Sequence, residues 1–139
     1  MHETLKYFAL KINISSIVHI AVINKEISAL KLITEMLEKL NVEDILDYQN
    51  KRSSTALHLA VESEQLDATR MLLQGKASPD VYDKDGDAPV HISVRNQNSE
   101  ILLLLFAFNV SNFRMHLIFR NVNLDRLIGI LVVVILIKY

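Results

Sequence analysis

Cysteine is absent from this 139-residue sequence, and only three glycines and two prolines occur in it. The lack of cysteine excludes disulfides, thiol catalysis and zinc sites built on thiolates, and it is compatible with a reducing compartment. The scarcity of glycine and proline favours helices joined by short connections, because half of the residues are apolar and 22% are charged. A chain of this length can bury the core of one domain, and we expect that domain to be mostly α-helical.

An excess of positive charge is also missing. The formal net charge is −1, and no run of lysine or arginine occurs, so the sequence gives no reason to expect direct binding to nucleic acid. At the N-terminus, the apolar run in MHETLKYFALK is shorter than the hydrophobic segment of a signal peptide. We therefore expect the protein in the cytoplasm or the nucleus.

The sequence does contain one unit three times. The three segments are SIVHIAVIN from Ser16, TALHLAVES from Thr55 and APVHISVRN from Ala88. His58 and His91 are 33 residues apart, whereas His19 and His58 are 39 residues apart, which is one period and six residues. A fixed period of this size is typical of arrays whose units stabilise one another by stacking.

Each unit is predicted to form two short helices. In the second unit, Thr55 is placed to accept a hydrogen bond at the start of the first helix, and the second helix is expected from about Leu66 to Leu73. Asp67 and Arg70 lie on the polar face of that helix with the spacing of an ion pair. Helices of this length are not stable alone in water, so they must stack on a neighbouring unit.

These segments resemble the ankyrin repeat family, whose consensus runs from an Asp or Asn and a Gly through T-P-L-H-x-A-A to L-L-x-x-G-A. DKDGDAPVH from Asp83 supplies the acid, Gly86, Pro89 and His91, while NKRSSTALH from Asn50 and LLQGKASPD from Leu72 supply the second unit. The resemblance implies an all-α ankyrin repeat solenoid of about three helix-turn-helix repeats. These repeats cover residues 16–49, 50–82 and 83–112, between an N-terminal segment, 1–15, and an irregular apolar tail, 113–139.

The three repeated histidines have a chemical and a structural interpretation. Histidine is a common general base and metal ligand. His19, His58 and His91 share one phase of the repeat, however, so they are a layer apart along the stack and too far apart to bind one ion. In the family, this ring bonds to a threonine hydroxyl and to the adjoining turn. The resemblance therefore assigns structural roles to His19, Thr55, His58, Gly86, Pro89 and His91, with Ala88 replacing the threonine in the third repeat.

The segment DKDGD, residues 83–87, also fits part of a calcium-binding loop. With Gly86 at the invariant sixth position, Val81 and Ile92 occupy positions that require acids, so the calcium interpretation fails. A turn in which Gly86 has positive φ explains the same residues. Phosphate-binding glycine loops, nucleophile elbows and HExxH pairs are missing from the sequence. We expect no enzyme activity, no metal and no cofactor.

Two glycines of the consensus are replaced in this sequence. Ser53 stands in the turn, and Lys76 stands after the outer helix of the second repeat. Each replacement costs about 1 kcal/mol if positive φ is kept there. The alternative is that Gly75, one residue earlier, ends the helix instead.

The insertion between the first two repeats indicates which ankyrin proteins this sequence resembles. ITEMLEKLNVEDILDYQN is predicted to continue the outer helix, and together with HIAVINK it is similar to the early repeats of the IκB family and of Relish-like NF-κB precursors. This resemblance implies a module of NF-κB signalling and immune regulation that binds and inhibits a Rel-homology transcription-factor dimer. The alternative is a generic ankyrin adaptor for another protein partner.

In ankyrin families, partners contact the finger loops and the exposed ends of the inner helices. By register, these positions are Lys51, Arg52, Ser54, Lys84, Asp85 and Asp87 on the fingers, and Ile23, Asn24, Glu62, Ser63, Arg95 and Asn96 on the inner helices. Their polarity is compatible with a hydrated, transient interface, and the alternative is that they are only solvated.

The repeat pattern stops after the third unit. Leu124 occupies the place of a fourth histidine, so we expect a shortened member of the family. The apolar run Leu127–Ile137 is about 17 Å long as a helix, against about 30 Å of bilayer hydrocarbon, so a membrane span is not expected and a peripheral anchor is the alternative. Because SEILLLLFAF is apolar on nearly every face, the tail, 113–139, is predicted to cover it as a cap, unless it has no evolved role.

Overall fold

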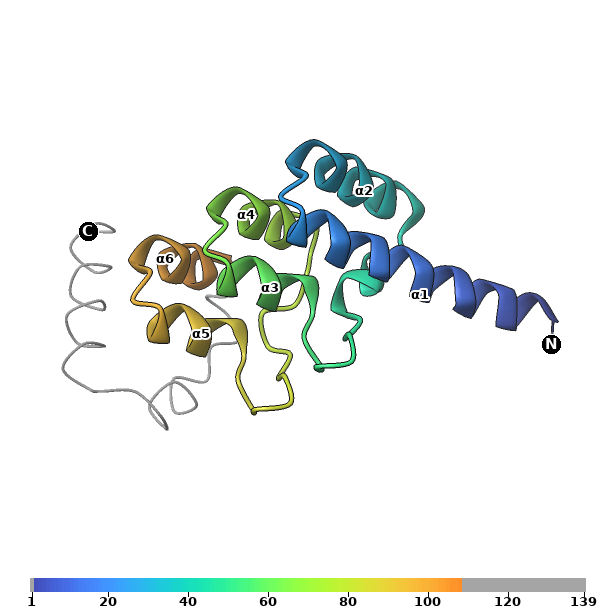
Figure 1. Cartoon of the computed structure of the whole chain (residues 1–139). Helices are drawn as coiled ribbons and strands as arrows, with labels where there is room; N and C mark the ends of the chain where they lie inside the picture. Colours follow the sequence, from blue (N-terminus) through green and yellow to red (C-terminus); the bar gives the residue numbers. More distant parts are fainter. Residues whose placement is uncertain (1, 109–139) are drawn as a thin grey trace.

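The computed structural model describes residues 2–108, and these residues form helices and no strands. The elements in chain order are α1 (His2–Ile23), α2 (Ile27–Leu40), the 3-10 helix η1 (Glu43–Asp47), α3 (Ala56–Glu62), α4 (Leu66–Gln74), α5 (Pro89–Arg95) and α6 (Ser99–Phe108). The six α-helices of this part of the chain form the antiparallel pairs α1–α2, α3–α4 and α5–α6, which are stacked side by side (Figure 1). The predicted all-α repeat architecture is confirmed.

The stack has two rows of helices. The inner row contains α1, α3 and α5, and the outer row contains α2, α4 and α6, with each helix in contact with its neighbour in the same row. Small buried residues let the inner helices approach closely: Ala21, Ala60 and Ser93 occupy the same position of the three repeats. The core continues through all three repeats, and Leu30, Leu57, Leu72 and Leu102 are fully buried in it.

Residues with positive φ reverse the chain at the helix ends. Between the helices of each repeat these residues are Lys25 (59°), Glu64 (57°) and Gln97 (57°), and after the outer helices they are Asn41 (53°) and Lys76 (73°). The next amide bonds back to the helix that has just ended, as in the bond from Gln65 N to Ala60 O (2.9 Å). This is the pattern of a Schellman cap.

Positive φ also occurs in the loops before α3 and α5, at Ser53 (56°) and Gly86 (79°). The positive φ predicted for Gly86 is therefore confirmed, and positive φ is kept at Ser53 and Lys76 although neither is glycine. Gly75 is the C-cap residue of α4 but has φ −75°, so the left-handed residue is Lys76 and not Gly75. Its small size has a different use, since a Cβ there would lie 3.3 Å from Cβ of Thr34 on α2.

The structure differs from the sequence-based expectation at the first repeat. The segment 1–15 is not set apart, because α1 runs without a break from His2 to Ile23 and projects beyond the other helices (Figure 1). The outer helix does not run on through the insertion either. It ends at Leu40, Asn41 takes the left-handed conformation, and the inserted residues form η1. Ile45 and Leu46 of η1 are buried in the core.

Helix α1 is long and apolar enough over Glu3–Ile23 to cross a membrane by length and composition. In this structure, Val18, Ala21 and Val22 near its C-terminal end are part of the core. The part of α1 from Glu3 to Leu10 is exposed, so only its C-terminal end is a core helix. The apolar run Leu127–Ile137, the suggested peripheral anchor and the predicted cap, 113–139, lie outside the described residues.

Candidate functional site

Two finger loops of the same design precede α3 and α5. The side-chain oxygen Oδ1 of Asn50 accepts hydrogen bonds from the backbone of Arg52 (2.9 Å) and Ser54 (3.1 Å). At the same positions 33 residues later, Oδ1 of Asp83 accepts from the backbone of Asp85 (2.9 Å) and Asp87 (3.0 Å). Each loop is thus closed by its own first side chain, as in other Asx turns.

The repeated histidine of the second repeat joins its finger to the next one. Nδ1 of His58 accepts from the backbone amide of Thr55 (3.1 Å) and contacts the Thr55 hydroxyl (2.8 Å). With Nδ1 as an acceptor, the ring proton is on Nε2, which donates to the carbonyl of Asp87 (3.0 Å). Burial is the main cause that lowers the pKa of His58 from 6.5. These contacts are those that the family resemblance implies for a structural His58 and Thr55.

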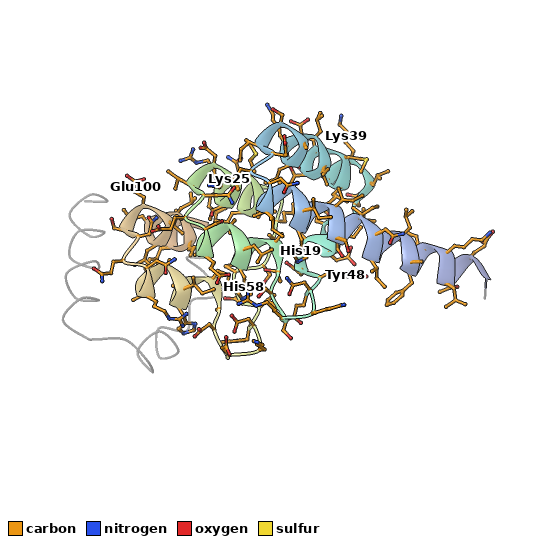
Figure 2. All side chains as sticks on the ribbon, in the orientation of Figure 1. His19, Lys25, Lys39, Tyr48, His58 and Glu100 are labelled. Atoms are coloured by element: carbon orange, nitrogen blue, oxygen red, sulfur yellow. The ribbon has the colours of Figure 1, made fainter. Side chains whose placement is uncertain are left out.

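The other two histidines keep the position but change the contacts. Nδ1 of His91 accepts from the amide of Ala88 (2.9 Å), and Ala88 has no hydroxyl to add. His19 lies within the continuous α1, where its ring nitrogens contact the carbonyls of Ser15 (2.6 Å) and Ser54 (3.0 Å). Figure 2 shows His19 and His58 on neighbouring inner helices. Each ring contacts a backbone carbonyl of the finger that follows its helix, Ser54 for His19 and Asp87 for His58. Residues 2–108 contain no group of three or more His, Asp or Glu side chains suited to a metal.

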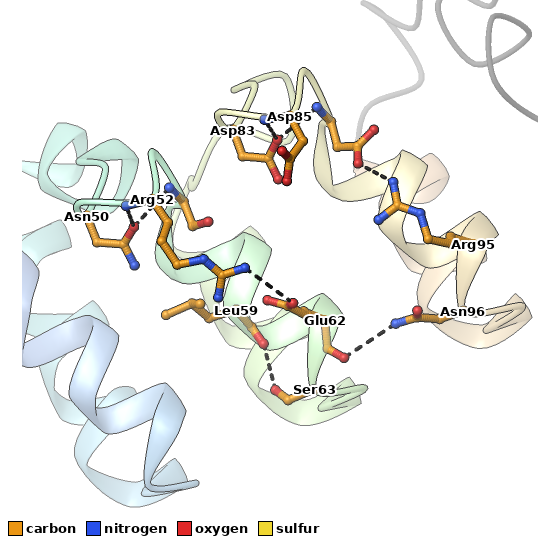
Figure 3. A network of polar contacts seen from close by, with 11 residues as sticks. Asn50, Arg52, Leu59, Glu62, Ser63, Asp83, Asp85, Arg95 and Asn96 are labelled. Carbon is orange, nitrogen blue, oxygen red and sulfur yellow. Dashed lines mark hydrogen bonds and ion pairs between the residues drawn. The ribbon is translucent and has the colours of Figure 1, made fainter.

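Each finger is tied to its inner helix by an ion pair, and the two pairs have opposite polarity (Figure 3). In the second repeat, Arg52 of the finger pairs with Glu62 of α3, with 3.9 Å between Nη2 and Oε1. In the third repeat, Asp87 of the finger accepts a hydrogen bond from Arg95 of α5. This bond is the main cause that raises the pKa of Arg95. The fingers are therefore charged differently, with two basic residues in 50–54 and three acids and one lysine in 83–87.

Most of the predicted contact positions lie on the exposed surface formed by the fingers and the ends of the inner helices. The exposed residues are Ile23, Asn24, Lys51, Arg52, Glu62, Ser63, Lys84, Asp85, Arg95 and Asn96. Ser54 and Asp87, by contrast, are buried. The carbonyl of Ser54 contacts Nε2 of His19, and the carbonyl of Asp87 accepts from Nε2 of His58. These two residues therefore hold the fingers in place rather than present side chains to a partner.

Two residues that support this surface, Gln49 and Tyr82, were not identified from the sequence. Nε2 of Gln49 donates to the carbonyls of Ser53 (2.7 Å) and Tyr82 (2.8 Å) and so links the two fingers. Nδ2 of Asn96 reaches the carbonyl of Glu62 (3.4 Å) and links the two inner helices. The 33-residue spacing of Gln49 and Tyr82 was the available signal, because residues one period apart are neighbours in a stack.

Comparison with known proteins agrees with this architecture. Residues 18–114 match the family model for ankyrin repeats (3 copies). The chain belongs to the ankyrin repeat family. Ankyrin repeats form a protein-interaction fold that is not typically enzymatic, and the finger surface is the kind of surface that such a fold offers to a partner.

The relatives of this ankyrin chain include NF-κB proteins. It is 35% identical to human NF-kappa-B inhibitor epsilon over 83 residues, which are 60% of this chain and 16% of that protein. It is 27% identical to the NF-kappa-B p105 subunit of Gallus gallus over 93 residues, 67% of this chain and 10% of that protein. A putative ankyrin repeat protein of fowlpox virus is 30% identical over 129 residues, 83% of this chain and 22% of that protein.

A solved structure gives the same picture. The ankyrin repeat domain of Bcl-3, described as a unique member of the IκB protein family, superposes with a TM-score of 0.61 at 26% identity, covering 68% of this chain and 41% of that domain. The resemblance to IκB proteins and NF-κB precursors is thus confirmed. The chain spans less than a quarter of the length of NF-kappa-B inhibitor epsilon, the p105 subunit and the fowlpox virus protein.

Proposed function

We propose that this chain is an IκB-like module that binds and inhibits a Rel/NF-κB-type transcription factor in the cytoplasm or the nucleus. The observation that carries the proposal is the finger surface, which is exposed, polar and braced at each finger by a histidine and an ion pair. The similarity to NF-kappa-B inhibitor epsilon, p105 and Bcl-3 supports a Rel-homology dimer as the partner.

The charges of the two fingers specify what the partner must present. Lys51 and Arg52 are exposed at the tip of the first finger, and Lys84 and Asp85 are exposed at the tip of the second. Because the acids outnumber the lysine in the second finger, a complementary partner carries an acidic patch opposite the first finger and a basic patch opposite the second. Contacts of this kind add mainly specificity and association rate.

The proposal is tested by titrating the purified chain against a purified Rel-homology dimer. We expect binding at micromolar concentration, and the double variant Lys51→Glu/Arg52→Glu should weaken it by about tenfold or more, as expected for reversing two charges at an interface. The matched control is Lys31→Glu/Arg70→Glu, which reverses two exposed charges on the outer helices α2 and α4. Its affinity should remain within about twofold of the wild type.

Absence of binding to the dimer at micromolar concentration would contradict the proposal. The alternative function is that of an ankyrin adaptor for a different protein, and the same finger surface supports it. In that case a partner captured from cell extract and identified should be lost with Lys51→Glu/Arg52→Glu and retained with the control. Equal loss in both double variants would show that the fingers are not the binding surface.

A further inference from the structure

In the described part of the chain, residues 2–108, a second exposed surface is apolar. Helices α1 and α2 of the first repeat lie at one end of the stack (Figure 1). They carry the apolar residues that we call the end face, namely Ile17, Ile20, Ala29, Leu32, Met36 and Leu40. Leu32 is 68% exposed, Leu40 is 61% exposed and Met36 is 44% exposed. Exposed apolar residues gathered in this way are typical of an interaction surface.

The repeat itself shows that these positions belong to an interface. Ile17, which is 51% exposed, corresponds to Ala56 and Pro89, which are both buried. Ala29 likewise corresponds to the fully buried Ala68 and Ile101.

On the outer row, Leu32 corresponds to Met71. Met71 faces α2 across the groove between the two outer helices. The end face therefore has the composition of the surfaces that are buried between successive repeats.

The outer part of the end face is self-complementary in shape. Leu32, Met36 and Leu40 are four residues apart on α2, so at 3.6 residues per turn they form one row along the helix. Two copies of α2 can pair antiparallel about a two-fold axis at Met36. Leu32 of each copy then lies opposite Leu40 of the other, and the interface closes without further growth.

The charges beside the row also fit a second copy. Glu35 and Lys39 are exposed and both lie on the same side of the row, away from Leu37. In an antiparallel pair about Met36, that side of one helix faces the same side of the other. Glu35 of each copy is then adjacent to Lys39 of the second copy, which gives two symmetric ion pairs flanking an apolar centre.

We propose that the end face is a dimer interface, in which the α2 helices of two copies of this chain pair antiparallel through Leu32, Met36 and Leu40. The interface lies on α2, whereas the finger surface lies on the loops before α3 and α5 and on the exposed ends of the inner helices. Dimerisation does not depend on binding to a Rel-homology dimer, and the two proposals can fail separately.

Sedimentation equilibrium of the full chain over a range of concentrations tests the dimer. We expect a reversible monomer–dimer equilibrium whose dissociation constant rises about tenfold or more in Met36→Lys, since the variant places two like charges at the two-fold axis. The matched control Gln74→Lys adds the same charge at an exposed position of α4 and should leave the equilibrium unchanged. Circular dichroism verifies that both variants are folded.

A charge swap identifies the pairing more closely. Glu35→Lys alone and Lys39→Glu alone should each weaken the dimer, and the double variant Glu35→Lys/Lys39→Glu should restore it to within about twofold, because both ion pairs re-form with exchanged signs. A chain that is monomeric at every concentration would overturn the proposal, as would association that Met36→Lys leaves unchanged. So would a monomer that floats with phosphatidylcholine vesicles and loses this binding in Met36→Lys, because the face would then serve a lipid surface.

Discussion

The same residue position has three different surroundings in this molecule. His58 has a threonine hydroxyl and a backbone amide at Nδ1, His91 has the amide of Ala88, and His19 has two carbonyls. The difference follows from what begins the helix. Thr55 and Ala88 are extended residues before a helix, with ψ of 169° and 162°, whereas α1 is already helical at Ser16. The hydrogen-bond partners of the repeated histidine therefore depend on the residue three positions before it.

The third repeat can be improved by supplying the missing hydroxyl. Ala88 has nearly the same φ and ψ as Thr55, so the hydroxyl of Ala88→Thr should reach Nδ1 of His91. We expect the free energy of unfolding to rise by about 0.5–1 kcal/mol, measured by urea denaturation. Ala88→Val is the matched control, because it adds the same bulk without the hydroxyl. An equal gain in both variants would attribute the effect to packing.

The buried His58 ring should make the protein sensitive to mild acid. Its pKa is below 6.5 in the folded state, so between that pKa and 6.5 the unfolded chain binds a proton that the folded chain does not. The contribution to stability is complete above about pH 6.5 and declines as the pH falls toward the folded pKa. NMR titration of the His58 ring should give a midpoint below 6.5. A midpoint at or above 6.5 would contradict the assigned burial and tautomer.

At the scale of helices and loops, the chain maintains its turns with residues that are poorly suited to them. Among residues 2–108, six residues other than glycine have positive φ, and five of them follow a helix. The Schellman bonds and the buried helix faces hold these residues in place. For each of them except Asn41 the conformation alone is unfavourable by about 1–2 kcal/mol, whereas asparagine adopts it readily. Packing of the repeats thus outweighs local preference at the turns that have neither glycine nor asparagine.

Exchanging the residues of the two fingers tests this point. Ser53 and Gly86 occupy the same position and both have positive φ. Ser53→Gly should raise the free energy of unfolding by about 0.5–1 kcal/mol, because glycine adopts this conformation without strain.

Gly86→Ser should lower it by a similar amount. A Cβ at residue 86 meets nothing within 4 Å, so the change reports backbone strain alone. Urea denaturation of both variants gives the two values, and effects of the same sign would contradict the argument.

Much of this local structure could be predicted from the sequence. The helix expected at about Leu66 to Leu73 is observed at Leu66–Gln74, and the Asp67–Arg70 pair is present at 3.6 Å. Helical periodicity and the 33-residue spacing can be read directly from the sequence, and they were sufficient to predict this helix and its ion pair. The buried Ser54 and Asp87 could not be identified in this way, because their burial depends on which carbonyl the histidine of the neighbouring repeat reaches.

The helix boundaries of the first repeat were also less predictable, because they depend on tertiary contacts. In the first repeat, the position equivalent to Thr55 and Ala88 is Ser16, which lies inside α1. The helix continues through this position, so no capping motif is needed there. The end of α2 at Leu40 is set by Asn41 and by the burial of Ile45 and Leu46, which are tertiary effects. Sequence periodicity alone favoured a longer outer helix.

At the scale of the whole molecule, the three repeats share one core and should unfold together. Leu72 of the central outer helix is fully buried, and Leu72→Ala should cost about 2–5 kcal/mol. We expect the helical signal in urea to keep a single transition at a lower midpoint, because the central repeat contacts both others. Ile23→Ala, at a 63% exposed position, is the control and should change stability by less than about 0.5 kcal/mol. Two separate transitions would show that the repeats are independent.

The opposite charges of the two finger loops also act on a partner that is not yet in contact. A molecule whose net charge is −1 has a weak overall attraction or repulsion for other charged molecules. Its unequal fingers nevertheless form an electric dipole, whose field turns an approaching charged protein before the surfaces touch. Ionic strength should therefore alter how fast such a complex forms more than how long it lasts.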